Sequence, residues 1–254
     1  MQRQGRVGVC SKCTHKILKG SPNPICPLTL SLSPFPVRGH ASILRLAMAS
    51  PIDLGNGILH YTGYLSPDAQ HALAAQVMAR AGKRWMAPRT PGGQPFSVRQ
   101  MNFGPLGWIS DSRGYRYEAT QPETGEPWPD MPDAVRDLWA SLLPEAPAPQ
   151  CCLVNHYQGA AKMGLHRDAD EEDQTTPILS ISLGQPARFR IGNETRKGPT
   201  RSVILNSGDI IILGGASRHF HHGIDRLMPA DDLFAPDIGV PGRLNLTLRR
   251  VTRA

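Results

Sequence analysis

The chain has 254 residues, 40% of them hydrophobic, which is enough for one domain with a sizeable core and extensions. No apolar run approaches the length of a membrane-spanning helix, so the sequence predicts no membrane partner. The net charge of +7 comes from the first 50 residues, which hold seven basic residues and no acidic one, while the rest of the chain balances 21 against 21. The excess charge is therefore no evidence that the folded part binds nucleic acid.

The first 47 residues are expected to be a disordered basic extension, because their middle is rich in Ser and Pro and lacks helical or strand periodicity. We interpret Met48 as the biological start and the extension as a misassigned upstream translation. An organelle-targeting peptide, which is typically rich in Arg and poor in acidic residues, is the alternative. The folded domain is expected to span residues 48–254.

The five cysteines do not predict a disulfide framework. Cys151 and Cys152 are adjacent and are expected to be buried thiols. The other three lie in the extension, where only His15 is near enough to serve as a fourth zinc ligand, and we therefore disfavour zinc there. These three are Cys10, Cys13 and Cys26.

Two helices are predicted before residue 150. The first covers residues 66–82, because Ser66 is a suitable N-cap ahead of a first-turn proline and Gly82 is a suitable stop. The second covers residues 132–143, where apolar side chains recur at helical spacing. A proline-rich stretch over residues 144–149 ends it.

Short strands separated by turn residues are predicted in the second half of the chain. This pattern suits a double-sheet jelly roll, so the expected fold is mainly β (α+β), a double-stranded β-helix core over about 150–252 with flanking N-terminal helices. The predicted strands cover residues 153–157, 178–183, 187–191, 202–205 and 210–213.

The sequence His166-x-Asp168 and the later histidines of the 219–222 segment are candidate metal ligands. Two imidazoles and one carboxylate with open coordination positions suit a non-haem Fe(II) oxygenase. On an extended segment His166, Asp168 and Asp170 would project to the same side. The pair itself is expected roughly 0.5 times by chance, and Asp170 begins the acidic run 170–173, which is more often a solvated loop face.

The run Arg243-Leu-Asn245-Leu-Thr247-Leu-Arg249 is far more specific, because it is expected roughly 0.003 times by chance. On a strand its four polar side chains share one face and its three leucines share the other. Two guanidiniums beside a metal suggest a co-substrate that carries a carboxylate. The alternative is an amphipathic strand with a solvated cationic face.

Together these segments resemble the AlkB family of alkylation-repair dioxygenases. The resemblance rests on Asn155-His-Tyr157, His166-x-Asp168-x-Asp170, Ser217-Arg218 leading to His222-Gly223, and Arg243-x-Asn245-x-Thr247-x-Arg249. Upstream, the segments Leu106-Gly107-Trp108, Gly114-Tyr115-Arg-Tyr117 and Pro127-Trp128-Pro129 resemble the nucleotide-recognition lid of the family. The resemblance covers about 52–252, with the lid over about 84–118.

The resemblance implies Fe(II) as the metal, with 2-oxoglutarate and O2 as co-substrates. It implies that the iron ligands are His166, Asp168 and His222. It also implies that Tyr157 and Arg243 bind the far carboxylate of 2-oxoglutarate, while Asn155, Asn245 and Arg249 serve its keto-acid end. His156 stands where the family often has arginine, but on a strand it faces away from its two neighbours and is not expected to disturb the co-substrate.

The resemblance also implies a set of substrate contacts. Trp108 is expected to stack an extruded base against His166, and Tyr115 with Arg196 to hold flanking phosphates or the base edge. Asp170 is expected to favour cationic lesions through its charge. A buried packing tryptophan is the alternative for Trp108. A local phosphate-binding patch is expected from the lid arginines, Arg84, Arg89, Arg99, Arg113 and Arg116.

The function implied by the resemblance is DNA repair by oxidative demethylation of 1-methyladenine and 3-methylcytosine, preferably in single-stranded DNA. Succinate, CO2 and formaldehyde are the expected products, and a cytoplasmic monomer is the expected form. The alternatives are an RNA or tRNA demethylase of the same chemistry, a zinc-dependent hydrolase, and a non-catalytic nucleic-acid-binding relative. The arginine-bearing strand argues against the hydrolase, and the complete ligand set argues against a silent binder.

Overall fold

The computed structural model describes residues 50–229 and 237–253, so the expected extension, Met48 and the three N-terminal cysteines lie outside the described residues. The described helices are α1 (Pro67–Ala81) and α2 (Asp133–Leu142), with a short 3-10 helix, η2 (Gly215–His219). The described strands are β1 (Ile52–Asp53), β2 (Ile58–Tyr61), β3 (Arg99–Phe103), β4 (Gly107–Asp111), β5 (Gly114–Glu118), β6 (Cys151–Tyr157), β7 (Met163–His166), β8 (Ile178–Gly184), β9 (Ala187–Ile191), β10 (Arg201–Leu205), β11 (Ile210–Leu213), β12 (His222–Leu227) and β13 (Arg243–Arg249).

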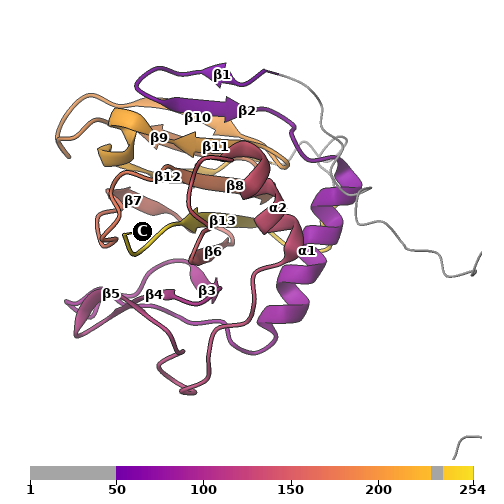
Figure 1. Ribbon diagram of the computed structural model, residues 1–254, viewed down its shortest axis with the longest axis vertical. Helices are drawn as coiled ribbons and strands as arrows, with labels where there is room; N and C mark the ends of the chain where they lie inside the picture. The colour runs from indigo at the N-terminus through magenta and orange to yellow at the C-terminus, as the bar shows by residue number, and fades with distance from the viewer. Residues whose placement is uncertain (1–49, 230–236, 254) are drawn as a thin grey trace, which may run out of the picture. The chain divides into compact units, whose positions relative to one another are not determined.

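These strands form three antiparallel sheets (Figure 1). The large sheet has seven strands in the order β1-β2-β11-β8-β13-β6-β3, and the small sheet has four in the order β10-β9-β12-β7. Of the described strands, β4 and β5 pair with each other alone, as a hairpin. The described chain is therefore mainly β, a jelly roll with both α-helices ahead of the core strands, and this confirms the predicted fold class.

The large sheet is buried on both faces, and each face has its own apolar cluster. One cluster joins α1 and α2 to the sheet, and Figure 1 shows both helices alongside it. From β13 this cluster includes Leu244, Leu246 and Leu248. The second cluster joins the large sheet to the small one through residues such as Ile211 of β11 and Phe189 of β9. Period-two alternation therefore points every second β13 side chain into the space between the sheets.

Both helices form where the sequence predicts them. Ser66 caps α1, because its hydroxyl accepts a hydrogen bond from the backbone N–H of Ala69. Gly82 ends α1 with φ at +51°, in the left-handed region that favours glycine. Pro132 precedes the first turn of α2, which ends at Leu142. No helix among the described residues is long and apolar enough to cross a membrane.

The predicted strands are confirmed with small shifts at their ends. Strands β9 and β11 have the predicted bounds, while β6, β8 and β10 extend one or two residues further. Cys151 and Cys152 are buried free thiols, as predicted. Burial raises the pKa of the Cys151 thiol to about 12, so it is protonated at neutral pH.

Candidate active site

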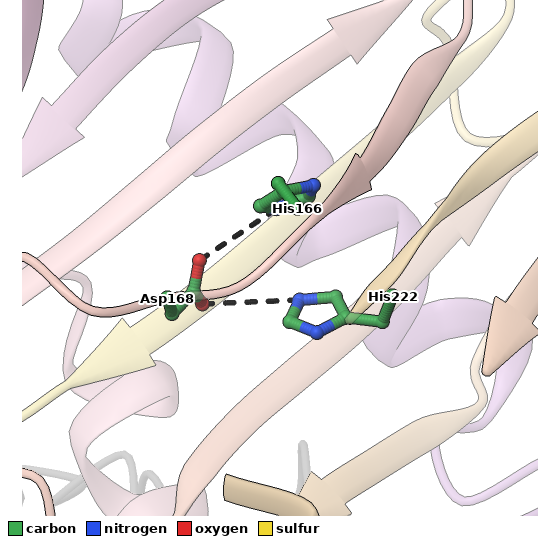
Figure 2. A group of neighbouring side chains, drawn as sticks. All are labelled: His166, Asp168 and His222. Atoms are coloured by element: carbon green, nitrogen blue, oxygen red, sulfur yellow. Dashed lines mark ion pairs between the residues drawn. The ribbon is translucent and has the colours of Figure 1, made fainter. Parts of the chain in front are cut away.

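Three side chains meet at one end of the space between the two sheets. His166 ends β7 and His222 begins the neighbouring strand β12, where the two residues are directly paired. The two rings lie with their centroids 4.7 Å apart, and the Asp168 carboxylate faces both of them, with Oδ1 3.6 Å from Nε2 of His166 and Oδ2 3.9 Å from Nε2 of His222 (Figure 2). One ligand atom from each residue lies within 4.8 Å of the others, a spacing at which one ion can contact all three.

The hydrogen bonds of the two imidazoles favour metal binding. Nδ1 of His166 lies 2.9 Å from the carbonyl oxygen of Gly164, and Nδ1 of His222 lies 3.1 Å from that of Phe220. A protonated Nδ1 that donates to a carbonyl leaves the lone pair of Nε2 directed at Asp168. Burial, aided by the nearby His166, lowers the pKa of His222 to about 4, so this imidazole is neutral at physiological pH.

The carboxylate of Asp168 is ionised although it is buried. Burial alone would raise its pKa, but the Arg249 guanidinium beside it holds the pKa well below its usual range. Nε and Nη2 of Arg249 both donate to Oδ2, at 3.0 and 2.7 Å. Two imidazoles and one ionised carboxylate are the donor set that suits Fe(II) with open coordination positions.

One expectation about this segment is wrong. Strand β7 ends at His166, so Asp168 and Asp170 do not continue an extended strand. Arg218 of η2 fixes the loop instead, because its Nη1 donates to the carbonyl oxygen of Asp168 at 2.7 Å and its Nε to that of Thr176 at 3.1 Å. The side chain of Asp168 therefore reaches the histidines through a loop that a buried arginine holds.

The acidic run 170–173 is likewise not a solvated loop face. Glu171 and Asp173 are buried. Glu171 accepts hydrogen bonds from the Tyr117 hydroxyl at 2.5 Å and from Nη2 of Arg218 at 3.1 Å. Glu171 is therefore the anionic partner of the buried Arg218, and it also lies 3.3 Å from Nε of Arg249. The Asp173 carboxylate instead accepts hydrogen bonds from the hydroxyls and backbone N–H groups of Thr175 and Thr176.

The polar face of β13 lines a cavity of about 630 Å³ between the two sheets. Arg243 is fully buried, yet no carboxylate of the described residues forms an ion pair with it. Its Nη2 donates to the Ser182 hydroxyl at 2.7 Å, while its Nε has no hydrogen-bond partner among residues 50–229 and 237–253. Burial lowers the pKa of Arg243 to about 10, which leaves it charged at neutral pH. A buried cation without a counter-charge is suited to a carboxylate ligand.

Arg249, six residues further along β13, has a different environment. Besides the two bonds to Asp168, its Nε lies 3.3 Å from a Glu171 oxygen, so its charge is balanced. Its Nη1 is buried and has no hydrogen-bond partner in the part of the chain that the structure describes. Arg249 therefore lies at the metal end of the cavity and Arg243 at the other end, and both line it.

The remaining expected co-substrate residues line the same cavity. Tyr157 lies directly opposite Arg243 across β6 and β13, and burial raises the pKa of its hydroxyl well above the usual range. Asn155 lies opposite Asn245 in the next polar row. The amide nitrogen of Asn245 donates to the Ser180 hydroxyl at 2.7 Å. The amide oxygen of Asn155 accepts a hydrogen bond from the Gln100 side chain.

The four expected substrate residues also line this cavity. The Trp108 ring stacks on Tyr115 of the β4–β5 hairpin, with centroids 5.6 Å apart and planes 13° apart. Its Nε1 donates to Asp170 at 2.8 Å. Arg196 lies in the loop between β9 and β10 and forms no ion pair within the part of the chain that the structure describes.

Three of the five arginines of the expected phosphate-binding patch of the lid are paired with carboxylates. Arg116 forms ion pairs with Asp111 and Glu118 of the same hairpin, and Arg113 lies 3.6 and 3.5 Å from those two carboxylates. Arg84 pairs with Glu126 at 3.1 Å. The expectation counted cations and ignored acidic residues that the hairpin register brings beside them.

Sequence reasoning missed two residues that shape this site, Gln100 and Glu171. Gln100 is buried in the cavity wall on β3, directly opposite Asn155. The alternation Gln100-Met-Asn102-Phe on β3 was the available signal, because a strand that places amides on one face and apolar groups on the other has a polar lining to provide. Glu171 gave no signal beyond membership of the acidic run.

Comparisons with known proteins identify this arrangement. Residues 57–249 match the family described as the 2OG-Fe(II) oxygenase superfamily. The chain is 49% identical over 209 residues to the alpha-ketoglutarate-dependent dioxygenase AlkB homolog of Caulobacter vibrioides, across 82% of this chain and 93% of that protein. The chain belongs to the AlkB family of 2OG-Fe(II) oxygenases. AlkB of Escherichia coli K12 is 41% identical over 165 residues, across 63% of this chain and 74% of that protein.

A solved structure, that of OsALKBH1, matches this AlkB-family fold with a TM-score of 0.68 at 28% identity, over 78% of this chain and 98% of that chain. The chain is therefore an Fe(II)- and 2-oxoglutarate-dependent dioxygenase that consumes O2. Its family acts on nucleic acids: more distant relatives include a protein named tRNA demethylase abh1 of Schizosaccharomyces pombe, 28% identical across 54% of this chain and 47% of that protein. Another is named DNA N(6)-methyladenine demethylase ALKBH1D of Arabidopsis thaliana, 38% identical across 40% of this chain and 25% of that protein.

Proposed function

We propose that this enzyme repairs single-stranded DNA by oxidative removal of N-methyl groups from 1-methyladenine and 3-methylcytosine. The observation that carries the proposal is one cavity that holds both the His166–Asp168–His222 group and the aromatic Trp108. A base captured by Trp108 would lie in the same enclosed space as the metal ligands. Such a base must leave its stack, which costs least when it is damaged or unpaired.

The metal site fits iron, and the chain supplies the ligands. His166, Asp168 and His222 would hold it through two Nε2 atoms and one carboxylate. Bound iron would supply O2 activation and the oxidation of the N-methyl carbon, which the protein alone cannot perform. Arg218 and Arg249 keep the carboxylate of Asp168 in place through its carbonyl and its Oδ2.

The far end of the cavity fits the distal carboxylate of 2-oxoglutarate. Arg243 brings a buried charge with an unpaired Nε, and Tyr157 beside it brings a hydroxyl that stays protonated. Both groups donate hydrogen bonds, and the carboxylate accepts them. Asn155, Asn245 and Arg249 lie nearer the metal ligands, where we assign them to the keto-acid end.

The rim of the cavity fits a flipped cationic base. The indole of Trp108 offers a stacking surface, and Asp170, bonded to its Nε1, brings a carboxylate that attracts the positive charge of 1-methyladenine or 3-methylcytosine. Tyr115 and Arg196 lie at the mouth, where they would contact flanking phosphates or the base edge. The oxidised methyl group then leaves as formaldehyde, with succinate and CO2 as the products of 2-oxoglutarate.

The second candidate is an RNA or tRNA demethylase of the same chemistry. It is favoured by the relative named tRNA demethylase abh1. A non-catalytic relative is disfavoured because the metal-ligand group and the buried Arg243 are both present.

We further propose that the enzyme acts as a monomer in the cytoplasm, with a folded unit that starts near residue 48, a lid over 84–118 and a core over 150–252. Sedimentation of the purified chain tests the monomer, and N-terminal sequencing of the native protein tests the start.

The proposal is tested with the full chain, Fe(II), 2-oxoglutarate and O2. The substrates are two single-stranded oligonucleotides of identical sequence, one DNA and one RNA, each with a single 1-methyladenine. We expect the DNA to lose the mass of one methylene group only when iron and 2-oxoglutarate are both present. Demethylation of the RNA alone would support the second candidate. Intact oligonucleotides with continuing succinate release would contradict both and call for another substrate. His166→Ala is the control without a complete ligand set.

A further inference from the structure

Gln100 and Asn155 form a bonded pair of side-chain amides in the cavity wall. They lie directly opposite each other on β3 and β6, and both line the cavity. Gln100 is only 1% exposed, and its Nε2 donates to Oδ1 of Asn155 at 2.8 Å. We infer that Gln100 is a positioning residue, which turns the amide nitrogen of Asn155 toward 2-oxoglutarate. This inference rests on the role proposed above for Asn155.

The direction of this amide matters because its two ends have nearly the same shape and opposite hydrogen-bonding character. The carboxylate and keto oxygens of 2-oxoglutarate only accept hydrogen bonds at neutral pH. An Asn155 that presents its nitrogen attracts them, and one that presents its oxygen repels them. Gln100 occupies the oxygen, and the nitrogen donates to no other group within residues 50–229 and 237–253. The donor is therefore left for the ligand.

The neighbouring amide shows why Gln100 is needed at this position. Asn245, opposite Asn155 on β13, is oriented by its own sheet: its nitrogen donates to the Ser180 hydroxyl at 2.7 Å and to the carbonyl of Ile181 at 3.2 Å. Asn155 has no such contact with its neighbouring strands among the described residues apart from the one to Gln100. Without that contact, rotation about the last side-chain bond would leave both ends available to the cavity.

Stability alone does not account for a glutamine here. Oε1 of Gln100 is buried and has no hydrogen-bond partner in the described chain. An unpaired buried acceptor costs roughly 1–3 kcal/mol. Methionine has nearly the same length and would remove that cost, but it would also remove the hydrogen bond to Asn155. The bond to Asn155 is therefore the contact that offsets the unpaired acceptor, and it is the contact that orients the Asn155 amide.

The test measures 2-oxoglutarate binding without turnover. The full chain is loaded with Fe(II) under anaerobic conditions and titrated while the visible absorption of the iron–2-oxoacid chelate is followed. We expect Gln100→Met to weaken binding about 3- to 10-fold, which corresponds to roughly 1 kcal/mol, while the thermal midpoint without 2-oxoglutarate stays the same or rises. Gln121→Met is the matched control, since Gln121 is a buried glutamine outside the cavity lining, and we expect it to bind 2-oxoglutarate normally.

A double-mutant cycle shows whether Gln100 acts through Asn155. In an Asn155→Ala background, Gln100→Met should cause no further loss of affinity. Gln100→Glu should weaken binding more than Gln100→Met, because a carboxylate accepts from the nitrogen of Asn155 and turns the oxygen toward the ligand. The effect of the negative charge of Gln100→Glu is measured separately, by combining this variant with Asn155→Ala. An unchanged affinity in Gln100→Met, or an equal loss in both backgrounds, would overturn the inference. An unchanged affinity in Asn155→Ala would instead contradict the role proposed for Asn155.

Discussion

The floor of the cavity and the hairpin at its rim are built in opposite ways. The floor lies on β13, which pairs with β6 on one side and β8 on the other, and its two arginines are buried. Among the described strands, β4 and β5 of the hairpin pair with each other alone, and Tyr115 near its turn is 47% exposed. Residues on β13 cannot shift without disturbing the core, whereas the exposed turn of the hairpin can vary at little cost to the fold. The chemistry is therefore assigned to the rigid part and substrate choice to the variable part.

The two regions also differ in how their charge is balanced. In the hairpin the positive charge of Arg116 is balanced by the carboxylates of Asp111 and Glu118. Arg116 therefore has little unpaired charge with which to attract an anionic ligand. On the floor Arg243 has no carboxylate partner among the described residues. We therefore expect the anionic co-substrate to bind inside the cavity. The density of arginines in the lid is a poor guide to where anions bind.

The largest expected effect is at the metal ligands of the floor. Both His166→Ala and Asp168→Ala should abolish iron binding and turnover, but they should differ in stability. The His166 side chain is 41% exposed, so its loss should leave the free energy of unfolding nearly unchanged. Asp168→Ala leaves the buried Arg249 with Glu171 as its one ion-pair partner among the described residues and should cost about 3 kcal/mol. Iron analysis and urea titration measure the two effects, and turnover by Asp168→Ala would refute the ligand set.

The next largest effect is expected at the far end of the floor. Arg243→Met should weaken 2-oxoglutarate binding by about 30-fold or more, since loss of one partner of a buried charge pair costs roughly 2–5 kcal/mol. Arg243→Lys should fall between this variant and the wild type, because lysine keeps the charge but lacks the planar fork. For both variants, the effect is measured as the 2-oxoglutarate concentration that gives half-maximal succinate release. A Met variant with the wild-type requirement would show that the co-substrate binds elsewhere.

At the rim, Trp108→Ala should separate base capture from oxygen chemistry. We expect oligonucleotide binding to weaken by roughly 1–3 kcal/mol, while slow decay of 2-oxoglutarate without substrate continues. Trp108→Phe keeps a stacking ring and removes only the N–H that donates to Asp170, so it should retain most of the affinity. Fluorescence anisotropy and succinate release measure the two activities. Loss of both in the Ala variant would indicate a structural tryptophan.

The smallest effect is expected at the hairpin arginines. Arg113→Ala should change oligonucleotide affinity less than twofold and leave its salt dependence unaltered, because Arg113 lies between two carboxylates. Arg196→Ala is the comparison, since this residue lines the cavity without an ion pair among the described residues. It should weaken binding to all sequences and reduce the salt slope by about one. A larger loss of oligonucleotide affinity in Arg113→Ala than in Arg196→Ala would indicate that the hairpin is the phosphate-binding site.

Local periodicity explains which features could be read from the sequence. The alternation on β13 predicted which side chains line the cavity and which leucines enter the core, because strand geometry depends on neighbours along the chain. The cap at Ser66 and the stop at Gly82 are local in the same way. These features needed no knowledge of how distant segments meet.

The features that were missed depend on contacts between distant segments. The bond between Gln100 and Asn155 joins residues 55 positions apart, and that between Arg218 and the Asp168 carbonyl spans 50. Composition and spacing do not report such pairs. The ion pairs of Arg116 follow from the hairpin register, which the sequence pattern did not fix. Resemblance to a family supplied the ligand set, and the structure supplied the groups that hold it in place.

The most direct test of this account is the stoichiometry of the coupled reaction. The full chain is given Fe(II), 2-oxoglutarate, O2 and a saturating single-stranded oligonucleotide that contains one 1-methyladenine, and succinate and formaldehyde are measured together. The account predicts nearly equal amounts, because the floor that binds the co-substrate and the rim that binds the base share one cavity. Succinate release that is neither stimulated by the oligonucleotide nor accompanied by formaldehyde would contradict it.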